Sequence, residues 1–182
     1  YDMASGWVSS NRLAKLNEDA VAPGAVGTFT FSVSNSNDSP GNHRLYVGLV
    51  ADGVTWFSSN THAYWDVWVN APYQASHVSQ SPPQTVANGE TKTLTKSYLN
   101  TGSNTWTKGV VNLALVDQNF NPISSYDMAS GWVSSNRLAK LNEATVAPGA
   151  VGTFTFSVSN SNDSSGNHRL YVGLVADGIT WF

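Results

Sequence analysis

The first 57 residues of the chain occur a second time, 125 residues later. Residues 1–57 and 126–182 match at 53 of 57 positions. The four differences are Asp19/Ala144, Ala20/Thr145, Pro40/Ser165 and Val54/Ile179. Repeats of solenoids and propellers are about 20–50 residues long, so a period of 125 predicts an array of whole domains that each bury their own core. The 182 residues hold about one and a half such periods.

The composition favours an all-β protein with few charges. Charged residues make up 12% of the chain, whereas 7 Trp, 7 Tyr and 7 Phe supply large apolar side chains. The net charge is −3 and Lys and Arg are not clustered, so no basic surface for nucleic acid or for an anionic membrane is expected. No apolar run approaches the roughly 20 residues of a membrane span. The absence of cysteine excludes disulfides and thiolate chemistry.

Alternation of apolar and polar residues predicts six strands. The clearest is 152–159, where Phe154, Phe156 and Val158 share one face. The predicted strands are 63–70, 91–100, 110–116, 137–141, 152–159 and 168–175. Turn sequences rich in Gly, Asn and Pro separate them, and no window shows helical periodicity. Short strands at such spacing predict an antiparallel β-sandwich with almost no helix.

Four segments of one period together resemble a known domain family. They read GETKTLTKSYLNTGSNTWTKG (89–109), VAPGAVGTFTFSVS (146–159), GNHRLYVGLVADG (166–178) and WDVWV (65–69). The set is similar to the four-tryptophan immunoglobulin-like domain, found in a selective-autophagy receptor family and in many secreted bacterial proteins. The most specific part is 100–106, where Asn100 can cap a turn, Gly102 can occupy it and Trp106 can fold back over the sandwich. The resemblance implies an Ig-like sandwich for each period.

The order of strands in that family places the repeat boundaries. Residues 1–72 are expected to be the C-terminal part of one Ig-like repeat, and 73–182 the next repeat without its last strand. That strand corresponds to 63–70, whose Trp65, Val67 and Val69 form an apolar face suited to an open groove. The segment 63–70 is expected to pair mainly with residues 3–50 or with another subunit, because a connector as short as 71–72 directs it away from the following unit.

No pattern in the chain predicts catalysis, a cofactor or a metal site. The histidines have no acidic or cysteine ligands at useful spacing, and the loop that starts at Asp117 departs from a calcium site at Pro122 and Met128. No GxSxG motif provides a nucleophile. The chain is therefore expected not to be an enzyme and to need no cofactor.

The aromatic residues divide into core and surface candidates. Trp106, Trp65 and the equivalent pair Trp56/Trp181 fit core positions. A second set consists of Trp7, its equivalent Trp132, Tyr64 and Trp68. This set predicts either an exposed platform for stacking on sugar rings or packing within and between domains.

Two acceptor triplets for N-linked glycans lie at predicted loop tips. They begin at Asn37 and Asn162, and Pro40 disfavours modification of the first. A solvated turn explains the same residues without modification.

Three functions remain open from the sequence. The first is a structural repeat of a long extracellular stalk or filament, whose partners are neighbouring copies of the same repeat. The second is a carbohydrate-binding module that uses the aromatic platform, and the third is a protein-binding Ig-like domain. A cysteine-free domain rich in Ser, Thr and Asn favours an extracellular or cell-surface location in a prokaryote.

Overall fold

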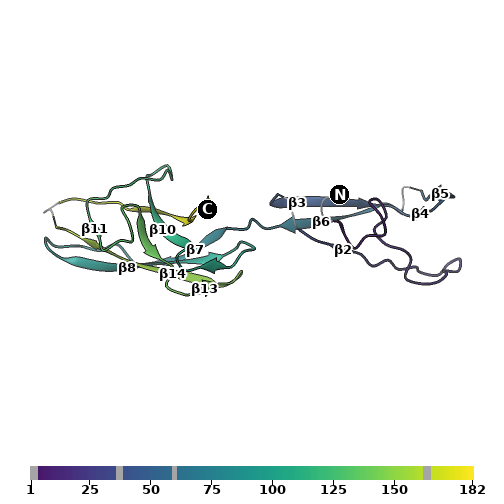
Figure 1. Ribbon diagram of the computed structural model, residues 1–182, viewed down its shortest axis with the longest axis horizontal. Helices are drawn as coiled ribbons and strands as arrows, with labels where there is room; N and C mark the ends of the chain where they lie inside the picture. Colours follow the sequence, from purple (N-terminus) through teal and green to yellow (C-terminus); the bar gives the residue numbers. More distant parts are fainter. Residues whose placement is uncertain (1–3, 36–38, 59–60, 162–164) are drawn as a thin grey trace. The chain divides into compact units, whose positions relative to one another are not determined.

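The computed structural model describes residues 4–35, 39–58, 61–161 and 165–182, and the chain in these ranges is all-β. The chain divides into two compact units, unit 1 over Tyr1–Val69 and unit 2 over Asn70–Phe182. Figure 1 shows the strands of both units.

Unit 2 contains two four-stranded antiparallel sheets. The first has the order β12 (Arg137–Lys140), β10 (Val111–Val116), β15 (Tyr171–Ala176) and β16 (Thr180–Trp181). The second has the order β11 (Ala129–Ser130), β14 (Val151–Ser159), β8 (Thr91–Asn100) and β7 (Ala75–Gln80). A short pair, β9 (Trp106–Thr107) with β13 (Thr145–Val146), lies beside them. The sheets share one core, which gives the sandwich-like architecture that the strand patterns predict.

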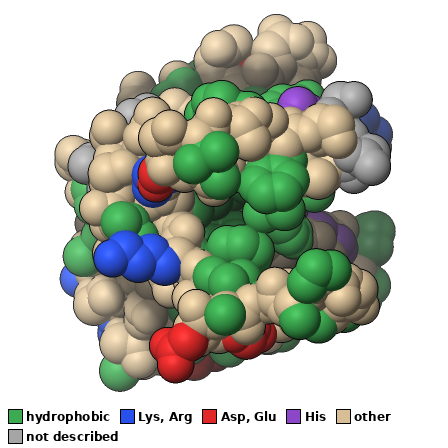
Figure 2. Space-filling model, turned by 90° about the vertical axis from the view of Figure 1, so that its right-hand side faces the viewer, with side chains coloured by type: hydrophobic (Ala, Val, Ile, Leu, Met, Phe, Trp, Pro, Cys, Tyr) green, Lys and Arg blue, Asp and Glu red, His purple; other side chains and the backbone are tan. Residues whose placement is uncertain are grey.

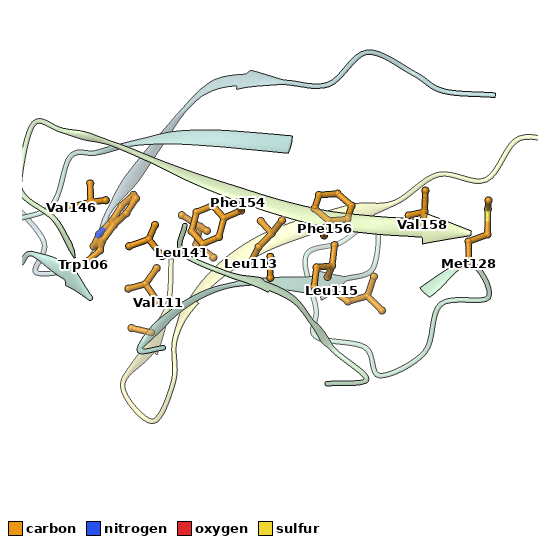
Figure 3. Packing of buried hydrophobic residues seen from close by; sticks show 14 residues of the cluster. Trp106, Val111, Leu113, Leu115, Met128, Leu141, Val146, Phe154, Phe156 and Val158 are labelled. Carbon is orange, nitrogen blue, oxygen red and sulfur yellow. The ribbon is translucent and has the colours of Figure 1, made fainter. Parts of the chain in front are cut away.

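The core of unit 2 follows the inward faces of both sheets. Phe154 is fully buried, and the centre of its ring lies 6.3 Å from that of Tyr98. It also packs in one cluster with side chains of the opposite sheet. Figure 3 shows the buried side chains in a row along β14, with Trp106 and Val146 at one end and Val158 and Met128 at the other. This row defines the two ends of the sandwich.

The segment 100–106 forms the predicted turn, with Asn100 as its cap and Trp106 packed inside the sandwich. The side-chain oxygen of Asn100 accepts the Gly102 N–H at 3.1 Å, and Trp106 is fully buried. A Cβ on Gly102 would lie 2.6 Å from the Pro72 carbonyl oxygen, so the close approach of two backbone segments explains the glycine. The Ala71 carbonyl oxygen also accepts the Ser103 N–H at 3.0 Å, which fixes the start of unit 2 at this turn.

The described residues of unit 1 form three two-stranded antiparallel pairs. They are β1 (Ala4–Ser5) with β2 (Ser32–Val33), β3 (Gly41–Val47) with β6 (Ala63–Val69), and β4 (Val50–Ala51) with β5 (Thr55–Trp56). The expected pairing of 63–70 within residues 3–50 is confirmed by the ladder between β3 and β6.

Unit 1 has almost no core, although most of its sequence recurs in unit 2. Among its described residues, Leu45 and Val69 are the buried hydrophobic side chains. Phe29 is 43% exposed, whereas Phe154, the equivalent residue in unit 2, is 0% exposed. In Figure 2, hydrophobic side chains gather around a hollow in the face that is viewed. The same sequence is therefore covered in unit 2 and uncovered in unit 1, because residues 73–125 provide the covering strands there.

Three tryptophans that were expected in the core are exposed. Trp56 is 60% and Trp181 is 39% exposed, and the guanidinium groups of Arg12 and Arg137 each lie 5.2 Å from one of these rings. These indoles cover the outer side of short hairpins instead of entering a core. Trp65 is 48% exposed because no sheet lies opposite it among the described residues of unit 1, although its ring does lie on the inward face.

Candidate functional site

The inward face of β6 makes apolar contacts within unit 1. In the ladder, Leu45 lies opposite Trp65, and the Trp65 ring meets the Phe31 ring edge-on at 5.4 Å. Val67 is half-buried and Val69 is buried, so the face Trp65, Val67, Val69 is the one that packs, in agreement with the alternation.

The outward face of the same ladder carries polar and aromatic side chains in register. Arg44 lies opposite Asp66 and donates to its two carboxylate oxygens at 2.7 and 2.9 Å. These hydrogen bonds lower the pKa of Asp66. The Arg44 guanidinium also lies 4.2 Å from the centre of the Tyr64 ring, which is 6.1 Å from the ring of Tyr46. Tyr46, Tyr64 and Trp68 are 71%, 56% and 73% exposed.

Unit 2 contains the β3 sequence without a β6-type strand. Residues 166–172 read GNHRLYV, identical to Gly41–Val47. β15 begins at Tyr171 and pairs on one side with β10, and within the described residues no strand lies opposite 166–170. The observed strand β15 thus begins three residues after the predicted start at residue 168. Residues 168–170 have no partner strand in the described part of the chain, and a strand needs a partner to form its ladder.

An open groove accompanies this unpaired edge. A hollow of about 910 Å³ is bordered by the edge segment 165–171, by the segment 80–86 that follows β7, and by apolar side chains on the side of the opposite sheet. Those side chains are Leu94, Met128 and Val158. A second hollow of about 520 Å³ follows the edge toward Val172 and Phe182. Together they form what we call the β15 groove, along residues 166–172.

The charged groups of the β15 groove differ from those at the equivalent ladder in unit 1. The Arg169 guanidinium donates a 3.4 Å hydrogen bond to the Tyr171 hydroxyl, and it makes no ion pair among the described residues. His168 lies 3.2 Å from a carboxylate oxygen of Asp127. At the second hollow, burial raises the pKa of Tyr98 to about 12. Arg169 is the groove residue that corresponds to Arg44, which holds Asp66 in unit 1.

The structure places the predicted aromatic platform on separate elements. Tyr64 and Trp68 project from the outward face of β6, as predicted. The Trp7 indole N–H donates to the Ser32 carbonyl oxygen at 2.8 Å, and the Trp132 indole N–H donates to the Ser157 carbonyl oxygen at 2.7 Å.

The Trp132 ring also stacks on Tyr126 at 5.9 Å, and both Trp7 and Trp132 are half-buried. Packing within each unit therefore accounts for these two indoles. Asn37 and Asn162 lie outside the described residues.

The described ranges contain no group of three or more potential metal ligands and no helix with the length and apolarity to cross a membrane. The loop at Asp117 is held by its own hydrogen bonds. The Asp117 carboxylate accepts the backbone N–H groups of Asn119 and Asn121 at 2.8 and 2.9 Å, and the bond from Asn121 is the main reason that the pKa of Asp117 is lowered.

Sequence reasoning missed Arg44, Tyr46 and Arg169 as parts of the site. The signal was present, because GNHRLYV alternates and occurs in both copies. The register with β6 determines which residues lie opposite its outward side chains, and a single sequence does not specify that register. A scan against family models, a search of curated proteins and a search of solved structures each find no significant match to the chain.

Proposed function

We propose that the chain is part of a structural, non-catalytic protein built from tandem 125-residue repeats, each forming one Ig-like sandwich at the cell surface or outside the cell. The observation that carries the proposal is that nearly identical sequences have different burial. Phe154 is enclosed where residues 73–125 precede it, and Phe29 is exposed where they do not. In an array, each half would be completed by its neighbouring sequence.

The same reasoning assigns the strand that completes a repeat. β3 pairs with β6 in unit 1, and the identical segment 166–172 has an open edge in unit 2. A copy of residues 58–72 that follows Phe182 would keep the 125-residue period and bring a β6-type strand to the β15 groove. Short connectors such as 70–72 between completed sandwiches would favour an extended rod.

The test is a longer variant of the chain in which the sequence of residues 58–72 is appended after Phe182. Burial of one Trp and two Val side chains contributes more than about 1 kcal/mol, so the melting temperature of unit 2 should rise by at least about 4 °C. The matched control replaces the appended tryptophan that corresponds to Trp65 by Asp, which should remove the gain. An unchanged melting temperature would contradict the proposed repeat.

A carbohydrate-binding module is the second candidate, favoured by the outward face of β6. Tyr46, Tyr64 and Trp68 expose their rings beside the Arg44–Asp66 pair, and exposed aromatic faces can stack on sugars. A glycan array tests this candidate. Binding that is lost in Trp68→Ala and kept in Trp132→Ala would support it, and an array without signal would reject it. The remaining protein-binding alternative has no such specific observation in its favour.

A further inference from the structure

We propose that the β15 groove of unit 2 binds the β6 strand of a second copy of this chain, in the register that β6 has with β3. The inference rests on the proposed function, since it names the partner of the edge that an array would complete. It adds that separate chains can associate through this edge. The occupant is one strand, Ala63–Val69, and the acceptor is residues 166–172.

The register follows from the identity of the two acceptor segments. In unit 1, Gly41 lies opposite Val69, Arg44 opposite Asp66 and Val47 opposite Ala63. Each acceptor residue recurs 125 positions later. Transfer of the ladder to unit 2 places Asn167 opposite Trp68, Arg169 opposite Asp66 and Leu170 opposite Trp65.

The apolar face of β6 fits the groove in this register. In unit 1 the Trp65 ring meets Phe31, whose equivalent in unit 2 is Phe156. Phe156 is 8% exposed and pairs in the sheet with Leu94, which borders the larger hollow. The hollow of about 910 Å³ lies where the indole would enter. Trp65 is 48% exposed in unit 1, so its transfer to this groove would bury apolar surface that its own unit leaves in solvent.

The charges of donor and acceptor are complementary. Arg169 has no carboxylate partner among the described residues, and the transferred register brings Asp66 opposite it. In unit 1 the same two residue types make a bidentate pair with bonds of 2.7 and 2.9 Å. Opposite charges directly across a ladder stabilise it, and like charges destabilise it.

The connector after β6 is too short for β6 to fill the groove of its own chain. The register requires Val69 opposite Gly166, at the end of the sandwich where Met128 and Val158 line the groove. The Ala71 carbonyl oxygen is held by Ser103 N–H, just beyond Asn100 at the Trp106 end. Along β8, Asn100 is roughly 15–20 Å from Leu94 and Thr95, given about 3.3 Å per residue. The two steps from Val69 to Ala71 span at most about 7 Å. A β6 strand of this sequence that enters the groove therefore comes from a second copy of the chain.

Such an interface joins different surfaces of the two copies. One copy offers β6 from unit 1 and the other offers the groove of unit 2, so the contact is head-to-tail. In such a pair the copy that donates β6 keeps a free groove and the copy that accepts it keeps a free β6, so growth would continue unless a ring closes. Association of the full chain should thus rise with concentration.

Sedimentation of the full chain over a range of concentrations tests the proposal. We expect oligomers whose dissociation constant rises about tenfold in Arg169→Glu, which places like charges opposite each other. The matched control is Arg44→Glu, the same substitution in the other copy of the sequence. It weakens the hold of β3 on β6 and should leave association unchanged or strengthen it. A monomer at every concentration, or equal weakening by both variants, would overturn the proposal.

The register has a test of its own because the chain contains no cysteine. A chain with Trp68→Cys and a chain with Asn167→Cys, mixed and oxidised, should form a disulfide between chains, since opposite residues lie about 4.5–5.5 Å apart. Trp68→Cys with Leu170→Cys, which is out of register, should not. A chain that carries both Trp68→Cys and Asn167→Cys and forms the bond as a monomer would show that its own strand fills the groove, which would overturn the proposal.

These outcomes separate the inference from the proposed function. If the full chain stays monomeric while the appended 58–72 sequence stabilises unit 2, exchange between chains is wrong and the tandem repeat stands. If chains cross-link in the stated register while the appended sequence has no effect on stability, the strand assignment stands and completion by the following sequence fails.

Discussion

Phe29 and Phe154 occupy the same position in two copies of one sequence, and we predict that their replacement by alanine has very different effects. Phe154 is 0% exposed, faces Tyr98 at 6.3 Å and pairs with Leu141. Its loss removes about 1.5–3 kcal/mol of burial and leaves a cavity that the two sheets cannot fill, so Phe154→Ala should cost about 3–5 kcal/mol. Phe29 is 43% exposed, and Phe29→Ala should cost less than about 1 kcal/mol.

The measurement is denaturant unfolding of both full-length variants, followed by far-UV circular dichroism, which reports on the strands of both units. The free energy of unfolding should fall in Phe154→Ala and stay within error in Phe29→Ala. Identical residues at equivalent positions make each variant the control for the other. Equal losses would refute the reasoning, because they would require that unit 1 has a closed core in solution.

Three further predictions concern unit 2. Trp106→Ala should lower the unfolding free energy by about 3–5 kcal/mol, and a midpoint shift worth under about 1 kcal/mol would mean that the indole is exposed. Gly102→Ala should cost about 1–3 kcal/mol in thermal unfolding, since the new Cβ meets the Pro72 carbonyl oxygen at 2.6 Å. Hydrogen bonds from Arg137 lower the pKa of Asp177, so its contribution to stability is present above the unfolded pKa of about 3.9 and is lost as the pH falls through the folded value. Asp177→Asn should flatten the loss of stability below about pH 4, and an unchanged acid profile would contradict this.

The sequence predicted strands well where each strand has a partner along its whole length. The segment 91–100 matches β8 at both ends, and 63–70 differs from β6 by one residue. The segment 168–175 was misplaced at its start because residues 168–170 have no partner strand among the described residues. Alternation describes the faces of a strand but not the presence of a neighbour, and GNHRLYV is a strand in unit 1 and mostly is not in unit 2.

Alternation also failed to show which face of the sheet that contains β10 is turned toward the core. All six residues of β10 are buried, so its pattern has no polar face. Trp181 lies near Gly173 on that sheet, under the Arg137 guanidinium, and this outer layer explains its partial exposure. The sequence predicts a core position for such a tryptophan, although one side of its ring is exposed to solvent.

The pairing of β3 with β6 is the link between this fold and any function in assembly. Leu45 and Val69 are buried there, while Trp65 stays half exposed for want of a second sheet. Unit 2 has the reverse arrangement, with a full core and an open edge beside a hollow of about 910 Å³. In unit 1, β6 buries little apolar surface, and in unit 2 the edge 166–172 lacks a strand among the described residues. Because the acceptor sequence is identical at both places, β6 fits either of them. The equilibrium between them then depends on how much more of Trp65 the β15 groove buries than unit 1 does. This difference in burial sets the direction of exchange, because Asp66 meets an arginine at both places, Arg44 in unit 1 and Arg169 in the groove, and the native ion pair therefore favours neither.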